Sequence, residues 1–440
     1  METHLPREAG DWAVTDTARA PAAFTPPAEW PTLATIREAA GLLAGHIVRT
    51  PLVEARRLSD LTGARVFVKY ENMQYTCAFK ERGALVKLAG LGPEARRRGV
   101  IAMSAGNHAQ AVAYHAARLG IPATIVMPEP TPFVKVSATR AHGARVVLAG
   151  ETVAEAQVEA QRISDAEGFT WVHPYDDADV IRGQGTIALE MLADCPDLDV
   201  IVVPVGGGGL ISGVAIAARA LKPGIRIIGV ETELYPAMVA AMRGEEAECG
   251  GNTLAEGIAV KHVGRLATAI ARQYVDGIVA VQESDIERAV DAFLTVQKTT
   301  TEGAGAAGLA ALMAYPDHFR GQKVGLVLSG GNIDPRILAS IIMRELTRAE
   351  RIAAIRVTMP DRPMMLAELA GIIGTRGGNI LEVSHHRFFL DVPAKGALVD
   401  VTVEARDGKH LDEIVDALND HGFTASRRPM PEGQPERAVL

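Results

Sequence analysis

The chain has 440 residues, of which 48% are hydrophobic and 22% are charged. This length allows roughly two or three domains, and the composition is that of a globular protein rather than a disordered one. The formal net charge of -8 gives no electrostatic reason to expect a nucleic acid partner. With no apolar run of membrane-spanning length, no secretory signal and only three scattered cysteines, we expect a soluble cytoplasmic protein.

Residues 1–31 are rich in Ala, Pro and Thr and show no periodicity, so we interpret them as a flexible extension. From 32 to 345, short β-branched runs alternate with longer Ala- and Leu-rich runs. This alternation predicts an α/β fold of βαβ units, with parallel sheets covered on both faces. The expected strands are 65–70, 99–104, 123–128, 144–149, 200–205, 226–231, 277–281 and 323–330, and the clearest helices are 107–119, 153–167 and 285–295.

The expected strand at 200–205 is followed by four consecutive glycines, Gly206 to Gly209, and then by an apolar helical run. A simple strand-to-helix turn needs one glycine or two, and each glycine loses much conformational freedom on folding. A strand, a glycine loop and a helix N-terminus together form an anion cradle, because backbone N–H groups remain unpaired there. We therefore expect a phosphate, although neither the P-loop nor the dinucleotide G-x-G-x-x-G pattern is present.

Three further features accompany the glycine loop. Lys80 opens a predicted helix in "CAFKERGA", and the segments "SAGN" at 104–107 and "SGGN" at 329–332 each end a predicted strand. Ligands of parallel α/β sheets bind at the carboxyl ends of the strands. A lone lysine at a helix start is usually a solvated surface charge, but this one occurs together with a phosphate cradle and two strand-end loops.

Residues 351–427 change in character and predict strand, helix, strand, strand, helix and strand. This is the order of the ferredoxin-like unit. The expected strands are 353–360, 379–389, 396–405 and 423–427, and the helices are 364–377 and 409–422. Residues 428–440 are expected to form an unstructured tail.

In combination, Lys80, "SAGNHAQ", the glycine run and "SGGN" resemble the pyridoxal-phosphate enzymes of the tryptophan-synthase-β fold type, and among them the threonine and serine dehydratases. The resemblance covers about 32–345 and implies a two-lobed catalytic region of mostly parallel sheets. The region 351–427 resembles an ACT domain, the amino-acid-sensing module that threonine dehydratases often carry. There, Met364 replaces the glycine usual after Asp-Arg-Pro, and a domain used only for assembly is the alternative reading.

The resemblance also implies a role for each motif residue. Lys80 would attach pyridoxal 5'-phosphate covalently and then remove the Cα proton of the substrate. The other cofactor contacts would be Phe79 with the pyridine ring, Asn107 with the 3'-oxygen, Gly206, Gly207, Gly208, Gly209 and the Leu210 amide with the phosphate, and Ser329 with the pyridine nitrogen. The substrate carboxylate would be held by the loop of Ser104, Ala105, Gly106, Asn107 and His108. Glu302 aligns with an acidic residue near the ring, but a glutamate at a helix N-terminus has an equally good structural explanation.

Two positions bear on the type of reaction. Ser329 offers a hydroxyl without charge, so the cofactor ring is a weaker electron sink, which favours prompt loss of a β-leaving group. Related serine racemases carry a serine where this chain has Ala105, and alanine cannot supply a second proton-transfer group. Cys77 and Ala78 replace the family's usual Gly-Ser, which affects the expected substrate preference more than the chemistry.

No metal site is expected. Metal-dependent relatives carry carboxylates after the strand that ends at Glu231, whereas this chain has Glu233, Tyr235 and Ala237 there. The adjacent pair His385-His386 is interpreted as ordinary strand residues, because neighbours on a strand point to opposite faces.

The implied activity is dehydration and deamination of L-threonine to 2-oxobutanoate and ammonia, with some activity on L-serine. A dehydratase that prefers L-serine or 3-hydroxyaspartate, a pyridoxal-phosphate β-replacement enzyme and a non-catalytic amino-acid-binding regulator remain as alternatives. Isoleucine or valine is the expected effector of the ACT-like region, and a homodimer or homotetramer is the expected assembly.

Overall fold

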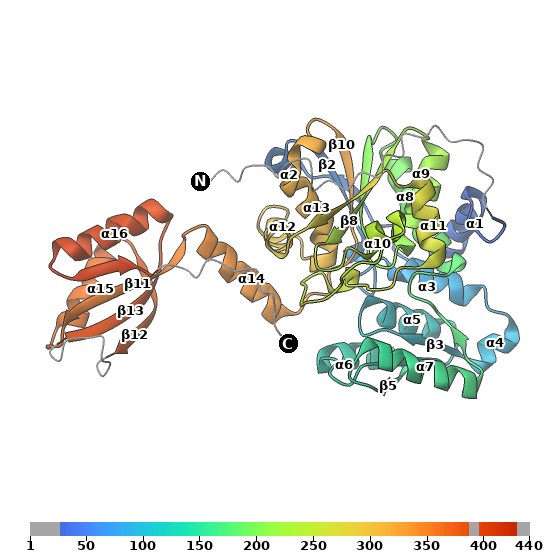
Figure 1. Cartoon of the computed structure of the whole chain (residues 1–440), viewed down its shortest axis with the longest axis horizontal. Helices are drawn as coiled ribbons and strands as arrows, with labels where there is room; N and C mark the ends of the chain where they lie inside the picture. Colours follow the sequence, from blue (N-terminus) through green and yellow to red (C-terminus); the bar gives the residue numbers. More distant parts are fainter. Residues whose placement is uncertain (1–26, 387–395, 429–440) are drawn as a thin grey trace. The chain divides into compact units, whose positions relative to one another are not determined.

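The computed structural model of the protein describes residues 27–386 and 396–428. The chain divides into two compact units, Met1–Ile333 and Asp334–Leu440, each with its own sheets (Figure 1). Residues 1–26 of the predicted extension (1–31), the end of the predicted strand 379–389 and residues 429–440 of the predicted tail (428–440) lie outside the described residues. Among the helices of the described ranges, none has the length and apolar character of a membrane-spanning segment.

A six-stranded sheet organises the first unit, in the order β1-β2-β10-β7-β8-β9. Only the edge pair of β1 and β2 is antiparallel, and the other pairs are parallel. The central β7 is buried along its whole length, as a parallel strand covered on both faces must be. The strands are β1 (Leu52–Glu54), β2 (Arg65–Tyr70), β7 (Val200–Pro204), β8 (Arg226–Thr232), β9 (Gly277–Val281) and β10 (Lys323–Leu328).

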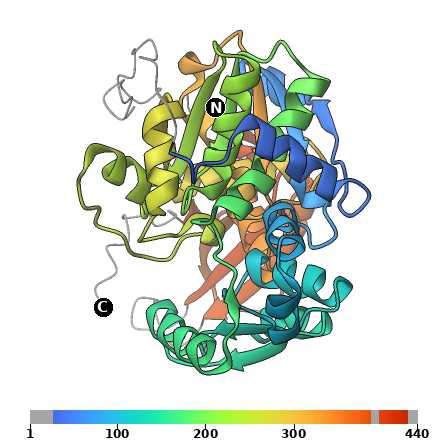
Figure 2. The same ribbon diagram turned by 90° about the vertical axis from the view of Figure 1, so that its right-hand side faces the viewer.

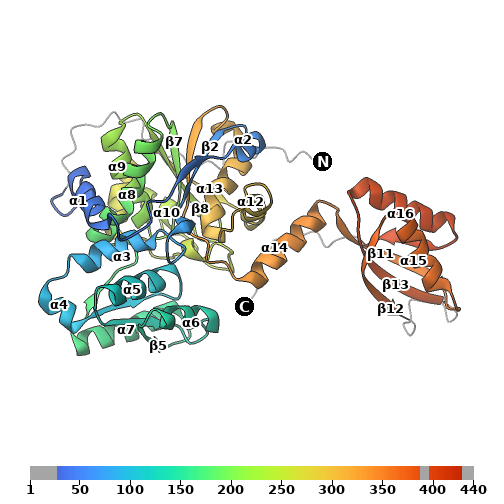
Figure 3. The ribbon, with the colours of Figure 1, turned by 180° about the vertical axis from the view of Figure 1, so that it is seen from behind.

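Helices cover both faces of this sheet (Figures 1 and 3). One face packs against α1 (Leu33–Leu43), α8 (Ala178–Asp194), α9 (Gly209–Leu221) and α11 (Arg265–Tyr274), and the other carries α2 (Arg56–Thr62), α12 (Glu283–Thr295) and α13 (Gly303–Ala314). Trp30, within the predicted extension, is buried in this core and meets Tyr274 edge-on. The described end of the extension is therefore packed rather than loosely attached.

A smaller four-stranded parallel sheet forms the second lobe of this unit, in the order β5-β4-β3-β6 (Figure 2). Its strands are β3 (Val100–Met103), β4 (Ala123–Met127), β5 (Arg145–Leu148) and β6 (Thr170–Trp171). The surrounding helices are α3 (Lys80–Ala89), α4 (Pro93–Arg98), α5 (Asn107–Arg118), α6 (Phe133–Ala141) and α7 (Val153–Glu167). The α/β fold with two lobes of mostly parallel sheet is confirmed, and only the short strands β1 and β6 were not predicted.

The second unit begins with α14 (Pro335–Arg348) and continues as a four-stranded antiparallel sheet. Its elements are β11 (Ile352–Pro360), α15 (Met365–Thr375), β12 (Asn379–His386), β13 (Gly396–Glu404), α16 (Gly408–Asp420) and β14 (Thr424–Arg427). The sheet order β12-β13-β11-β14 is that of a ferredoxin-like unit, which confirms the predicted succession of elements. Buried residues alternate along β13 and pack on the two helices, so one face of the sheet forms the core.

Candidate active site

A cavity of about 510 Å³ lies in the first unit where the carboxyl ends of β3, β7 and β10 come together. Its wall contains every residue that the sequence proposed for the site. They are Phe79, Lys80, Ser104, Ala105, Gly106, Asn107, His108, Gly206, Gly207, Gly208, Gly209, Leu210, Glu302 and Ser329. Segments more than two hundred residues apart in the chain thus meet at one place, as expected for the strand ends of parallel sheets.

Lys80 is the first residue of α3, and the segment before it is attached to the turn after β10. The Phe79 N–H donates to the Ser329 carbonyl (3.0 Å), and Ala78 forms a bridge with Gly330. The Lys80 ammonium donates to the carbonyl oxygen of Pro174 at 2.6 Å. Burial lowers its pKa to about 8, although the nearby Glu302 charge opposes the change. A larger fraction of neutral amine is therefore present near pH 7 than for a surface lysine, and the neutral amine is the form that acts as nucleophile or base.

The glycine loop joins β7 to α9, with Gly208 at a left-handed φ of 93° as the residue before the helix. No side chain fits along it. A Cβ at Gly207 would lie 2.2 Å from the Tyr175 ring, and one at Gly209 would lie 2.6 Å from the Tyr175 carbonyl oxygen. The glycines are thus required by close packing as well as by the backbone conformation.

The backbone N–H groups of Gly206 to Leu210 donate to no protein acceptor within the described residues. They belong to the cavity wall and to the first turn of α9, where the helix dipole adds positive potential. This arrangement of unpaired donors and positive potential suits a phosphate group, so the residues present fit the phosphate of pyridoxal 5'-phosphate.

The loop 104–108 offers a second set of backbone donors. Gly106 precedes α5, and its own N–H donates to the Ser104 hydroxyl (3.2 Å). The N–H groups of Ala105, Asn107 and His108 have no protein acceptor in the described part of the chain. The His108 imidazole is not available to an anion: its Nε2 contacts the Val172 carbonyl (2.9 Å), and burial lowers its pKa to about 3. The groups of this loop that are suited to bind a carboxylate are therefore the backbone N–H groups and the Ser104 hydroxyl, and not the His108 ring.

A chain of side-chain hydrogen bonds orients Asn107. Its Nδ2 donates to Glu302 Oε1 at 2.7 Å, and its Oδ1 accepts from Asn332 Nδ2 at 2.8 Å. Asn332 also donates to the Thr76 carbonyl (2.8 Å). Burial raises the pKa of Glu302 to about 7, against the effect of the Asn107 hydrogen bond. The second Nδ2 hydrogen of Asn107 remains for another acceptor.

Several residues of the cavity wall were not identified from the sequence: Lys135, Pro174, Tyr175, Tyr235, Glu256 and Asn332. Asn332 is the last residue of "SGGN", so its motif was recognised without its role. Pro174 and Tyr175 follow β6, whose two residues are too few to predict as a strand. Lys135 and Glu256 carry no local signal, because they meet only through the fold.

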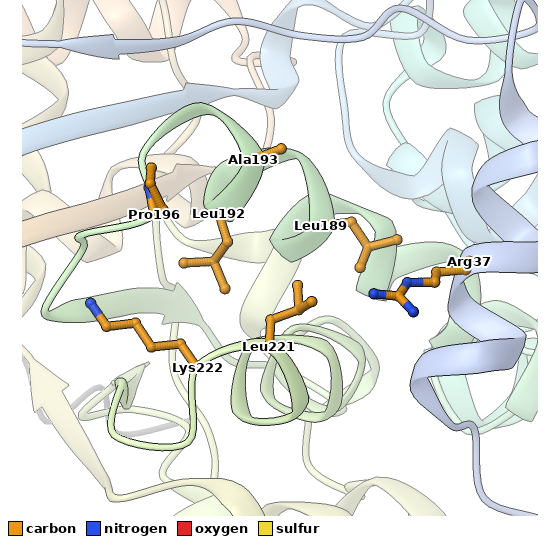
Figure 4. A pocket seen from close by; sticks show the side chains of 7 residues that line it. All are labelled: Arg37, Leu189, Leu192, Ala193, Pro196, Leu221 and Lys222. Atoms are coloured by element: carbon orange, nitrogen blue, oxygen red, sulfur yellow. The ribbon is translucent and has the colours of Figure 1, made fainter.

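A second cavity of about 380 Å³ lies between α1, α8 and α9 (Figure 4). Its wall is largely aliphatic, with the guanidinium of Arg37 directed toward Leu189 (Figure 4). It contains none of the predicted site residues. The candidate chemistry therefore belongs to the first cavity.

The profile of the family described as pyridoxal-phosphate dependent enzyme matches residues 43–330. The chain belongs to this family. It is 46% identical to an L-threonine ammonia-lyase of Thermotoga maritima over 394 residues. This match covers 89% of this chain and 98% of that protein. It is 38% identical to an L-threo-3-hydroxyaspartate ammonia-lyase of Saccharomyces cerevisiae, over 71% of this chain and 96% of the relative.

Among solved structures, threonine deaminase isoform 2 of Solanum lycopersicum is similar, with a TM-score of 0.68 and 33% identity over 78% of this chain and 98% of that one. The protein is therefore a pyridoxal-phosphate-dependent enzyme with the two-lobed fold of this family. The alternative of a non-catalytic regulator loses its support, because the lysine, the free donors and the strand-end loops are all present in one cavity.

Proposed function

We propose that the protein is an L-threonine ammonia-lyase, which removes the β-hydroxyl of L-threonine as water and, after hydrolysis, releases 2-oxobutanoate and ammonia. The observation that carries this proposal is the cavity that combines Lys80 with the unpaired N–H groups of two helix N-termini. The 46% identity to an L-threonine ammonia-lyase over 98% of its length supports the choice of substrate.

Pyridoxal 5'-phosphate, when bound, supplies an electron sink for negative charge at the substrate Cα. The residues that would hold it are Phe79, Lys80, Asn107, Gly206, Gly207, Gly208, Gly209, Leu210 and Ser329. Of these, the glycine loop would bind the phosphate through its backbone N–H groups, and Asn107 would donate its free Nδ2 hydrogen to the 3'-oxygen. Ser329, buried at the end of β10, would meet the ring nitrogen with a hydroxyl that carries no charge.

Lys80 Nζ is the proposed base for the Cα proton. Its lowered pKa, about 8, makes the neutral amine accessible near physiological pH. The carboxylate of the substrate would lie against the N–H groups of Ala105, Asn107 and His108, at the positive end of α5.

Elimination rather than racemisation follows from Ala105. Inversion at Cα requires a second proton-transfer group on the face opposite Lys80, and the methyl group of alanine supplies none. Glu302 is engaged by Asn107 at 2.7 Å, so we assign it to the orientation of Asn107 rather than to proton transfer with the substrate.

The second unit is proposed to be an ACT domain that binds isoleucine or valine and pairs with another copy, giving a homodimer or homotetramer. Its support is the ferredoxin-like order of elements and the Thermotoga relative, whose similarity covers 89% of this chain and so extends beyond residue 333. A cytoplasmic location completes the proposal, in keeping with three cysteines that are all free.

The test is a keto-acid assay of the purified holoenzyme with L-threonine and L-serine in parallel, each with and without isoleucine. We expect 2-oxobutanoate from threonine to form faster than pyruvate from serine, and isoleucine to change the threonine rate. Pyruvate formed faster would reverse the substrate assignment, and a bound cofactor without keto acid from either substrate would favour β-replacement.

A further inference from the structure

An ion pair connects the two lobes of the first unit at the wall of the cavity. Lys135 lies in the first turn of α6 beside the small sheet, and Glu256 lies in the short 3-10 helix η3 (Glu256–Ile258), which joins helices of the large sheet. The Lys135 ammonium donates to Glu256 Oε2, and both residues line the cavity. Their side chains are 29% and 71% exposed, so the pair lies at the solvent side of the site.

The backbone on either side of Glu256 is held in place by contacts with the glycine loop and with Glu283. A Cβ on Gly206 would lie 3.0 Å from the Ile258 Cα, which shows that η3 packs directly on the glycine loop. The segment before η3 is anchored by Glu283, which accepts hydrogen bonds from the Thr253 hydroxyl (2.6 Å) and the Leu254 N–H (2.7 Å). The charge of Glu256 is therefore carried by a backbone that is attached on both sides.

The charges around the cavity are few. Among the described residues of its wall, Lys80 and Lys135 are the cations, and Glu256 and Glu302 are the carboxylates. Lys80 is committed to the cofactor and the Cα proton, which leaves Lys135 as the cation for a second negative group. Both members of the pair act on Glu302 inside the cavity, where the Glu256 charge raises its pKa and the Lys135 charge lowers it. A charge on the substrate would feel them as well.

We propose that the Lys135–Glu256 ion pair is the specificity element of the site, which selects 3-hydroxy amino acids with an uncharged β-substituent and rejects those with a β-carboxylate. Lys135 is already neutralised, so a substrate with two carboxylates finds no free cation for the second one, which faces the carboxylates of Glu256 and Glu302. This proposal rests on the proposed function, in that the substrate is a 3-hydroxy amino acid, and it decides between threonine and 3-hydroxyaspartate.

The experiment measures kcat/KM of the holoenzyme for L-threo-3-hydroxyaspartate relative to L-threonine in four proteins: wild type, Glu256→Gln, Lys135→Gln and the double variant. Glu256→Gln frees the Lys135 charge, and we expect the ratio to rise by about tenfold at low salt. The double variant should return close to the wild-type ratio, and Lys135→Gln alone should fall below it. An unchanged ratio in Glu256→Gln, or a gain that persists in the double variant, would overturn the proposal.

Binding without turnover separates this proposal from the proposed function. Calorimetry with L-aspartate and L-2-aminobutyrate, which lack the leaving group, should show the same shift toward the dicarboxylate in Glu256→Gln. Glu129→Gln is the matched control, since it removes an exposed carboxylate near α6 that does not line the cavity, and it should leave both ratios unchanged. If wild type turns over no threonine but the binding ratios shift, only the proposed function fails; if threonine is turned over and neither ratio moves, only the specificity proposal fails.

Discussion

The two units of the chain bury different kinds of side chain. The first unit buries Lys69, Glu71, Glu81, Arg82 and Glu231, each with 0 to 1% of its surface exposed. In the second unit the core is apolar, and within its described residues the buried polar side chain is His410. Burying charge is costly unless it is paired, so the first unit gives up stability to hold polar groups in defined positions around a reaction site.

Three of these buried groups, Lys69, Glu71 and Arg82, form a network with Glu190, and Arg82 connects it to the helix that begins with Lys80. Arg82, two residues further along α3, donates two hydrogen bonds to Glu71 (both 2.8 Å) and others to Glu190. Lys69 adds a third contact to Glu190 (2.5 Å). The Arg82 contacts attach α3, and with it Lys80, to α8 and to the 3-10 helix η2 (Glu71–Met73) that follows β2, and the Lys69 contact attaches β2 to α8. In the second unit the comparable pair, Arg356 with Asp400, lies on the sheet surface with Arg356 41% exposed.

Removing Lys80 should produce the largest effect of all these changes, a loss of catalytic activity, which is a property of the first unit. Lys80→Ala should reduce keto-acid formation by about 10³-fold or more, because the proposed covalent attachment and the base are lost together. Lys87→Ala on the same helix is the matched control and should keep its activity. The keto-acid assay is run together with an absorbance spectrum of the bound cofactor. Substantial turnover by Lys80→Ala would contradict the assignment of Lys80 as the base.

Removing one arginine from each unit tests the difference in burial. Arg82→Met leaves the fully buried Glu71 without its cation and leaves Glu190 with Lys69 alone, and it should destabilise the protein by about 3–5 kcal/mol. Arg356→Met breaks a partly exposed pair and should cost less than about 1 kcal/mol. Urea unfolding of both variants measures the effect, and equal losses would show that the two units do not differ in this respect.

The pH dependence of stability should have opposite signs in the two units. Burial raises the pKa of Glu231 from 4.5 to about 8, although two backbone N–H groups oppose the change. Between these two pKa values the native state keeps a proton that the unfolded chain loses, so this group favours folding at low pH. Its contribution to the free energy of unfolding is lost as pH rises from 4.5 to 8, by at most about 1.4 kcal/mol per pH unit.

Asp400 acts in the other direction. The Arg356 hydrogen bond lowers its pKa, so its stabilisation is present above the unfolded pKa and is lost as pH falls through the native one. Unfolding titrations from pH 3 to 8 compare the wild type with Glu231→Gln and Asp400→Asn. Glu231→Gln should flatten the decline toward pH 8, and Asp400→Asn should flatten the decline in acid; a Gln variant with the wild-type slope would contradict the assignment to Glu231.

The smallest effects concern a backbone feature that the two units share. Cys77 has a φ of 57° and Met364 a φ of 76°, both in the left-handed region where a side chain crowds the backbone. Cys77→Gly and Met364→Gly should each stabilise the protein by up to about 1 kcal/mol. The conformational entropy that glycine loses on folding offsets part of this gain. Thermal unfolding measures this, and Met364→Ala, which keeps the Cβ, should give no such gain.

Much of the fold followed from local patterns. The strands at 65–70 and 277–281 and the helix at 153–167 were predicted to the residue, because β-branched runs between turn residues and Ala-rich amphipathic runs are local signals. The element order of the second unit followed for the same reason. The strand β6 did not, because its two residues have no pattern of their own, and with it Pro174 and Tyr175 were overlooked.

The sequence by itself determined the elements, the succession of strand-end loops and the residue types that suit a phosphate, a carboxylate and a reactive lysine. These depend on interactions between near neighbours in the chain. Only the tertiary structure decided that Asn332 orients Asn107, that Tyr175 leaves no room for a side chain on the glycine loop, and that Glu256 neutralises Lys135. Each of these contacts joins residues that lie far apart in the chain, and burial and charge at such a contact are set by packing, which no local pattern records.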